Sequence, residues 1–185
     1  MTRIPRRALL SGAAATLGLA ACGNGVGSPG AANIDARVAN TLAYLANQYP
    51  GTNDLNDKAV GKLVMPLITE ASFGFGGAYG RGALLVNDIT VDYYSATQAS
   101  FGIQAGAQQY SHVLYFMTEE ALAEFRASSG WAAGADVEYA VNDRGGNLSA
   151  ETTTVLAPVI AVVFGQAGLL AGASVEGTKY TRIIP

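Results

Sequence analysis

Hydrophobic residues change their spacing along the chain, and each spacing predicts a different kind of structure. A predominantly apolar stretch covers residues 8–21. Four apolar residues then recur at intervals of four, four and three: Ile34, Val38, Leu42 and Leu45. These intervals place the four side chains on one face of a helix, which we expect to begin near Asn33 and to end near Tyr49, before a Pro-Gly pair.

From residue 62 onward the dominant period is two, which is typical of β-strands. Thr97 to Gln108 alternates most regularly and predicts a long two-faced strand, with 110–117 as its antiparallel neighbour. Short helices are predicted at 53–58 and after Thr118, whose side chain can cap a helix that ends by Gly130. Further strands are predicted at 62–66, 72–79, 83–87, 90–94, 136–141, 159–164, 169–176 and 179–183, with a polar loop at 142–154.

Glycine is unusually frequent, at 23 of 185 residues, and several glycines interrupt strand patterns. Gly102, Gly106 and Gly172 are examples, and such positions usually mark bulges, sharp curvature or close backbone approach. The predicted fold is therefore α+β: a strongly curved, barrel-like antiparallel sheet with an N-terminal helix and a second helix packed on it.

The first 22 residues have the organisation of a bacterial export signal. Residues 1–21 combine a basic start with an apolar run of about 14 residues, shorter than the roughly 20 that span a membrane, and read as a signal peptide. The sequence Leu-Ala-Ala-Cys ending at Cys22 resembles a lipobox, which predicts acylation of Cys22 and a membrane anchor. The Arg6-Arg7 pair leaves both general and twin-arginine export open.

These features divide the chain into three predicted parts and place it in the bacterial envelope. A signal peptide at 1–21 precedes the lipidated Cys22 with a flexible tether to residue 32, and a folded domain covers 33–185. The residue after the cysteine is Gly23 rather than Asp, which favours the periplasmic side of the outer membrane.

Charge limits the partners of the mature chain. The net charge of −3 includes three arginines of the predicted leader, and the remaining chain holds eight basic and fourteen acidic residues, a net charge of −6. We therefore expect no nucleic-acid binding and no general attraction to anionic membranes. Half of the residues are apolar, so any affinity for lipid should arise from apolar surface or from a local pocket.

Motifs for chemistry are missing or incomplete. One His and one Cys cannot supply a Cys/His zinc site, a disulfide framework or a Cys-His dyad. The glycine-rich stretch 74–82 has Ala and Leu where a P-loop needs Lys and Ser/Thr, and the acidic run 53–57 fails the register of a calcium loop. His112 has no G-x-S-x-G elbow, so a hydrolase that uses it is the weakest alternative. We expect no enzyme activity, no metal and no cofactor.

Five separated segments resemble the bacterial branch of the SYLF domain family, in an order and spacing that match from about Ile34 to the C-terminus. They are residues 74–86, 99–108, 116–125, 129–136 and 168–178. The resemblance implies lipid binding, because eukaryotic members bind phosphoinositides and fungal members also bind actin. It also implies lipid contact by the N-terminal amphipathic segment. In this chain that segment holds Arg37 as its one basic residue, so we carry over general phospholipid binding without the phosphoinositide or actin specificity.

The sequence thus predicts a lipid-anchored envelope protein that binds phospholipids or acyl chains through a SYLF-like domain, and actin is not expected as a partner. The alternative is a lipid-anchored adapter without a lipid pocket. An apolar cavity would favour the first and an exposed apolar patch the second. The helical stripe has its own alternative, which is simply to cover the sheet. The candidate lipid-binding residues are Ile34, Val38, Leu42, Leu45, Arg81, Lys179 and Arg182.

Overall fold

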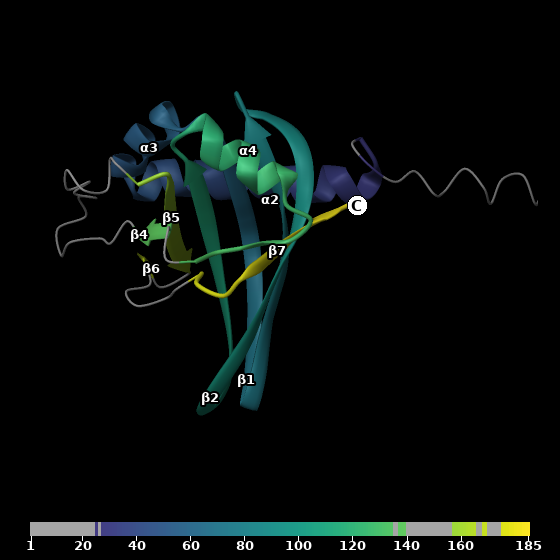
Figure 1. The fold of residues 1–185 in the computed structure, drawn as a ribbon. Coiled ribbons are helices and arrows are strands. Elements are labelled where there is room, and N and C mark those ends of the chain that lie inside the picture. The colour runs from purple at the N-terminus through teal and green to yellow at the C-terminus, as the bar shows by residue number, and fades with distance from the viewer. Residues whose placement is uncertain (1–24, 26, 135–136, 140–156, 166–167, 170–174) are drawn as a thin grey trace, which may run out of the picture.

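The computed structural model describes residues 25, 27–134, 137–139, 157–165, 168–169 and 175–185 (Figure 1). Helix α2 comes first, followed by a short 3₁₀ turn η2, helix α3, two long strands, helix α4 and five short strands. Their bounds are α2 Pro29–Gln48, η2 Pro50–Thr52, α3 Asn53–Lys58, β1 Gly61–Val86, β2 Ile89–Phe116, α4 Glu119–Ala127, β3 Trp131–Ala132, β4 Val137–Tyr139, β5 Val159–Gly165, β6 Gly168–Leu169 and β7 Lys179–Ile183.

Helix α2 begins earlier than its hydrophobic stripe predicts. Ser28 is the N-cap, and its Oγ accepts a hydrogen bond from the backbone N–H of Ala31 at 3.0 Å. Pro29 follows at the first helical position, where its fixed φ favours the helix. Asn33, the predicted cap, instead donates its side-chain amide to the Pro29 carbonyl. The last four residues of the predicted tether are therefore helical. The helix ends at Gln48 with Tyr49 as its C-cap, near the predicted end.

Strands β1 and β2 form one hairpin of unusual length. Its turn lies at Asn87 and Asp88, which both have positive φ, at 50° and 62°, as two-residue hairpin turns require. The prediction of several short strands across 72–117 is wrong, because all of these segments belong to the two strands. In particular, 97–108 and 110–117 are not neighbours: a single residue between them cannot make a turn, and both pair with β1.

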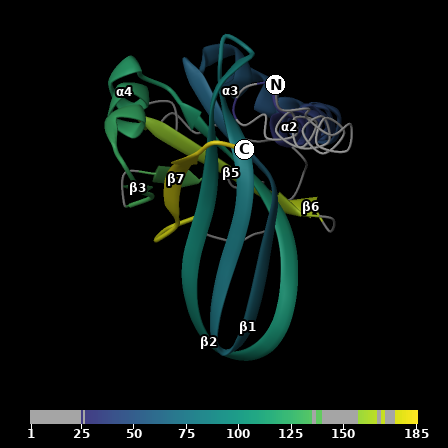
Figure 2. The ribbon, with the colours of Figure 1, turned by 90° about the vertical axis from the view of Figure 1, so that its right-hand side faces the viewer.

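The hairpin bends in the middle and folds back on itself (Figure 2). At the bend Gly106 pairs with Ser72 and Gly102 pairs with Gly74, so β2 carries two more residues than β1 there. The two halves of β1 then approach so closely that a Cβ on Gly82 would collide with the Val64 carbonyl oxygen. The predicted bulge and close backbone approach at glycines are confirmed in this hairpin.

The remaining strands complete a strongly curved sheet around β2. Strand β7 pairs with residues 93–97 of β2 and β5 pairs with residues 111–116, both antiparallel, and the sheet order is β3-β7-β2-β5-β4. Strand β6 pairs with β5, and β4 is parallel to β5. The α+β fold with a curved, mainly antiparallel sheet is as predicted. The predicted loop at 142–154 and most of the predicted strand at 169–176 lie outside the described residues.

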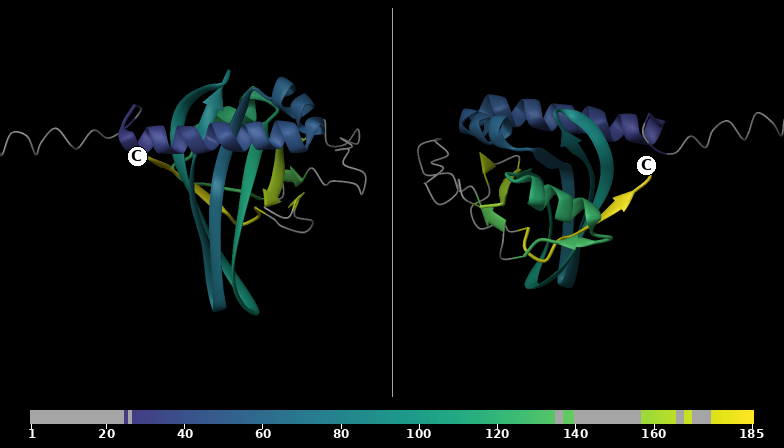
Figure 3. Two further views of the ribbon diagram at one scale, coloured as in Figure 1. Left: turned by 180° about the vertical axis from the view of Figure 1, so that it is seen from behind. Right: turned by 45° about the horizontal axis from the view of Figure 1, so that its top comes forward.

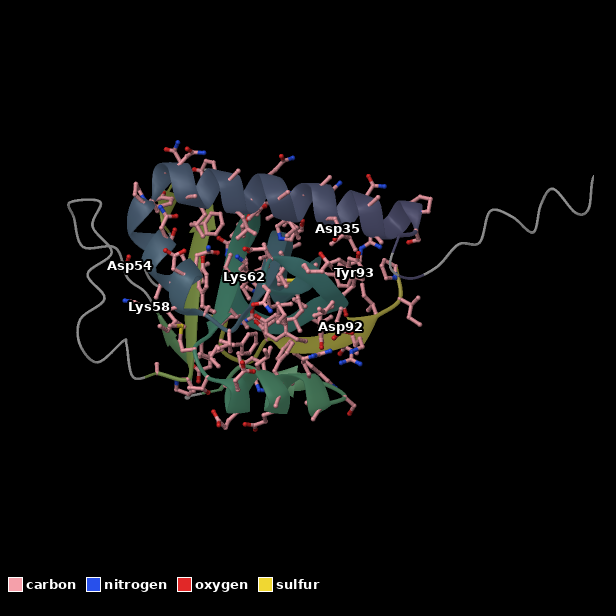
Figure 4. The ribbon with its side chains drawn as sticks, turned by 90° about the horizontal axis from the view of Figure 1, so that it is seen from above. Asp35, Asp54, Lys58, Lys62, Asp92 and Tyr93 are labelled. Atoms are coloured by element: carbon pink, nitrogen blue, oxygen red, sulfur yellow. The ribbon has the colours of Figure 1, made fainter. Side chains whose placement is uncertain are left out.

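Each face of the sheet carries a hydrophobic core covered by a helix, and the short α3 adds Leu55 to the core under α2. Helix α2 crosses one face and α4 covers the other (Figures 3 and 4). The row Val64, Val113 and Val162 lies in the core under α2, and the next cross-strand row lies in the core under α4. Helix α4 adds Leu122 and Phe125 to its core, and Thr118 caps it as predicted. Among the described residues, no helix has the length and apolar character needed to cross a membrane.

Candidate functional site

The helical stripe lies against the sheet. Ile34, Val38 and Leu45 have 5%, 2% and 1% of their surface exposed, and the half-buried Leu42 packs against the same cluster. Covering the sheet, the second of the two roles considered for the stripe, is therefore what these side chains do in this structure. Contact between them and lipid stays a prediction, and it would require α2 to leave the sheet.

A polar contact fixes α2 in this position. Asp35 accepts hydrogen bonds from the Tyr93 hydroxyl at 2.9 Å and the Thr90 hydroxyl at 3.0 Å. Figure 4 shows Asp35 and Tyr93 near each other on the side of α2 that faces the sheet. Burial and then the hydrogen bond to Asp35 raise the pKa of Tyr93 to about 12, so its phenol stays protonated and continues to donate.

A β-bulge in β1 shapes the surface beside α2. Met65 pairs with His112 and Ile68 pairs with Tyr110, so Pro66 and Leu67 together oppose Ser111. Proline lacks the N–H that a regular ladder needs, which explains a bulge at this position. The Ser111 hydroxyl donates to the Pro66 carbonyl at 2.7 Å, and Leu67 is left 37% exposed.

An apolar hollow of about 400 Å³ lies on one side of this bulge. Tyr44 from α2 and Phe164 from β5 stack there with ring centroids 6.0 Å apart. The two bulge residues, Pro66 and Leu67, line this hollow, and Tyr110 of β2 also lines it. Burial raises the pKa of Tyr110 to about 12, so no charge develops on its phenol at neutral pH.

A second, polar hollow of about 430 Å³ lies on the other side of the bulge and also includes Pro66 and Leu67 in its lining. Arg37 of α2 and Arg81 of β1 both line it, together with Tyr79, which is 54% exposed. The sequence predicted Arg81 as a site residue. It named Arg37 only as the single basic residue of the helical segment.

One flank of α2 connects the two hollows. Its lining residues follow helical spacing, from Gly30, Asn33 and Arg37 at the polar hollow to Thr41 and Tyr44 at the apolar hollow. We call the two hollows together the α2 groove. It is amphipathic along its length, with two guanidinium groups near the start of the helix and aromatic side chains near its end.

The other two predicted basic residues lie elsewhere. Arg182 pairs with Asp92 at 3.4 Å and donates to the Tyr94 hydroxyl, which raises the pKa of the guanidinium. It sits beside Tyr94, whose ring belongs to the core under α4. Lys179 is exposed on β7 and packs its stem near Gly130. Neither residue lines the α2 groove.

His112 is completely enclosed in the core under α4. It is 1% exposed, and its Nε2 lies 2.8 Å from the Tyr180 hydroxyl. Burial lowers the pKa of His112 to about 3, so the ring is neutral at physiological pH. Its Nδ1 has no hydrogen-bond partner within the described part of the chain.

Within the described ranges, no three His, Cys, Asp or Glu side chains come together as metal ligands. The predicted anchor Cys22 lies outside these ranges.

Comparison with known proteins gives a family match over much of the second half of the chain. Residues 97–182 match the model of the family Ysc84, described as Las17-binding protein actin regulator. The match includes four of the five segments that resemble SYLF domains and leaves residues 74–86 outside it. A search of curated proteins gives no significant match.

Proposed function

We propose that this chain binds phospholipids or acyl chains, and that the α2 groove is where it does so; the match of residues 97–182 to the Ysc84 (SYLF) family model supports this function. The proposed function does not include enzyme activity. An acylated Cys22 attaches it to the bacterial envelope, on the periplasmic side of the outer membrane.

The observation that carries the proposal is the amphipathic character of the α2 groove. Tyr44 and Leu67 offer apolar surface at one end, where the buried Phe164 stacks on Tyr44, and Arg37 and Arg81 offer positive charge at the other. A phospholipid has the same two-part chemistry. The volumes of the hollows, about 400 and 430 Å³, fall within the ~300–1,000 Å³ of small-molecule sites.

The overall charge of the protein supports a local site rather than adsorption to a membrane. The chain has a net charge of −3, which becomes −6 without the three leader arginines. Long-range attraction to an anionic bilayer is then unfavourable, and nucleic acid is not a proposed partner. Burial of acyl chain supplies roughly 0.8 kcal/mol per methylene, so a few methylenes exceed one screened surface contact.

An adapter function is the second candidate. Tyr44, Leu67 and Tyr79 are 41%, 37% and 54% exposed, and an apolar protein segment can also use such a surface. The description of the matched family, which names a binding protein and actin regulator, is consistent with a protein partner. Actin itself is not proposed, because an exported bacterial protein does not meet it.

Native mass spectrometry of the purified full chain tests the proposal. We expect co-purified phospholipid on the unmodified chain and its loss from Thr41→Trp, which fills the apolar hollow from α2. Ala46→Trp is the matched control, because Ala46 is exposed on the same helix and does not line the groove. Absence of lipid from the unmodified chain, together with no binding of added lipid, would favour the adapter.

A further inference from the structure

Arg37 and Arg81 are two positive charges in one hollow, and neither has a partner within the described part of the chain. No ion pair or hydrogen bond joins either guanidinium to another described residue, although both line the polar hollow. Most other described basic residues are paired: Lys58 with Asp54, Lys62 with Asp88, and Arg126 and Arg182 with Asp92. Lys179 has no ion pair among the described residues, but it lies on β7, away from the hollow.

The acidic residues near the hollow are occupied elsewhere. Asp35 of α2 accepts from Tyr93 and Thr90 on the sheet side of the helix. Glu70 follows the bulge in β1 and accepts from the Gln108 amide at 2.7 Å. The lining of the polar hollow itself contains no carboxylate. Two like charges that share a cleft repel each other, and an anion between them removes that repulsion.

The apolar hollow next to the arginines indicates what kind of molecule the anionic group belongs to. The polar and apolar hollows meet at Pro66 and Leu67 and share one flank of α2. A ligand that fills both must be charged at one end and apolar at the other. Guanidinium groups bind phosphate oxygens by paired, charge-assisted hydrogen bonds.

We propose that Arg37 and Arg81 form the phosphate subsite of the α2 groove, and that the groove takes a phospholipid with an acyl chain in the apolar hollow. This inference rests on the proposed function and makes it specific. Every glycerophospholipid has the phosphate, whatever its head group. The subsite therefore selects phospholipids over uncharged glycerides, and it does not select anionic over zwitterionic phospholipids.

The test compares two lipids that differ in the phosphate head group. Isothermal titration calorimetry measures 1-oleoyl lysophosphatidylethanolamine and 1-monooleoylglycerol, each below its micelle concentration, against the full chain with Cys22→Ser. We expect the lysophospholipid to bind about tenfold more tightly or better, as charge-assisted hydrogen bonds allow. In Arg37→Gln/Arg81→Gln the affinity for the lysophospholipid should fall by about tenfold and that for the monoglyceride should stay within about twofold.

The matched control removes two other exposed cations, in Lys58→Gln/Arg126→Gln, and should leave both affinities unchanged, because neither residue lines the α2 groove. A melting curve for each variant checks that the fold is intact. Equal affinity of the unmodified groove for the two lipids, or an unchanged double arginine variant, would overturn the phosphate subsite while the lipid-binding function stands. Failure of both lipids to bind would overturn the function itself. If sn-glycerol 3-phosphate binds as tightly as the lysophospholipid, the site serves a free phosphate ester and the lipid assignment is wrong.

Discussion

His112 is a buried, neutral side chain whose role is in the core. Its pKa is lowered by burial from the ordinary 6.5 to about 3. Between these values the unfolded chain takes up a proton that the folded chain does not, so the stability of the fold decreases as pH falls below 6.5. The His112 contribution is complete above this pH and changes by up to about 1.4 kcal/mol per pH unit below it.

Urea unfolding between pH 5 and 7 measures this effect, in the chain and in His112→Gln. We expect the unmodified chain to lose stability toward pH 5 more steeply than the variant, whose amide does not titrate. Lipid binding per folded molecule should be the same in both, since His112 does not line the α2 groove. Equal pH slopes for the two proteins would contradict the burial of a neutral ring. A selective loss of lipid binding in a folded His112→Gln variant would revive the hypothesis that His112 has a chemical role.

Gly82 permits a close approach between the two halves of β1. A Cβ at this position would collide with the Val64 carbonyl oxygen, which belongs to backbone and cannot rotate away. Gly82→Ala should therefore destabilise the fold by about 1–3 kcal/mol, the usual range for overpacking. Gly134→Ala is the control, because nothing lies within 4 Å of its added Cβ. Thermal melting of both variants is the measurement, and equal melting temperatures would show that the halves of β1 are farther apart.

At the scale of elements, α2 is part of the core. Leu45 is 1% exposed and Leu42 is half-buried, so their truncation should have unequal effects. Leu45→Ala should lower the free energy of unfolding by about 3 kcal/mol, and Leu42→Ala by less. Urea denaturation measures both. If Leu45→Ala leaves stability intact but weakens lipid binding, then the stripe contacts lipid with α2 away from the sheet.

The sequence predicted those elements whose signals are local. Helical spacing identified α2, a side-chain cap identified α4, and alternation identified strand character throughout 62–117. The start of α2 was missed because Ser28 and Pro29 are typical of linkers as well as of helix N-termini. The long hairpin was missed because glycines within 72–106 mark a bend in both strands, and from sequence alone a bend resembles a turn.

The α2 groove was less predictable than the fold, because its shape depends on the bulge at Pro66 and Leu67 in β1. Arg81 was identified from its charge, but Tyr44 and Phe164 are ordinary aromatic positions in a helix and a strand. They come together only because β5 lies beside β2, and α2 crosses that pair. Pro66 was a local signal for the bulge, since proline interrupts a strand ladder.

At the scale of the molecule, the fold begins close to the predicted anchor. Gly25 donates its N–H to the Pro185 carbonyl at 3.0 Å, and Ser28 donates its hydroxyl to the same carbonyl at 2.9 Å. Two residues lie between Cys22 and Gly25, so three residue steps separate them, a reach of about 11 Å when fully extended. An acylated Cys22 would hold the arginine end of the α2 groove near the membrane surface.

Membrane fractionation of Cys22→Ser tests this anchor. Several acyl chains on one cysteine exceed what stable attachment needs, and the acidic chain has little other attraction for a bilayer. We expect the variant in the soluble fraction, or with its leader uncut. Normal processing with full membrane retention would contradict the anchor and leave the α2 groove itself untouched.

The balance of charge and apolar surface determines how lipid binding should respond to head group and salt. The α2 groove offers two arginines to a phosphate that all phospholipids share, and the rest of the chain is acidic. The full chain with Cys22→Ser should therefore bind phosphatidylethanolamine and phosphatidylglycerol vesicles with similar affinity. It should lose little of that affinity between low and physiological salt, because the main contribution is burial of acyl chain. Vesicle co-sedimentation across a salt series is the measurement. Steep salt dependence with strict preference for phosphatidylglycerol would show that surface charge, rather than the apolar hollow, controls binding.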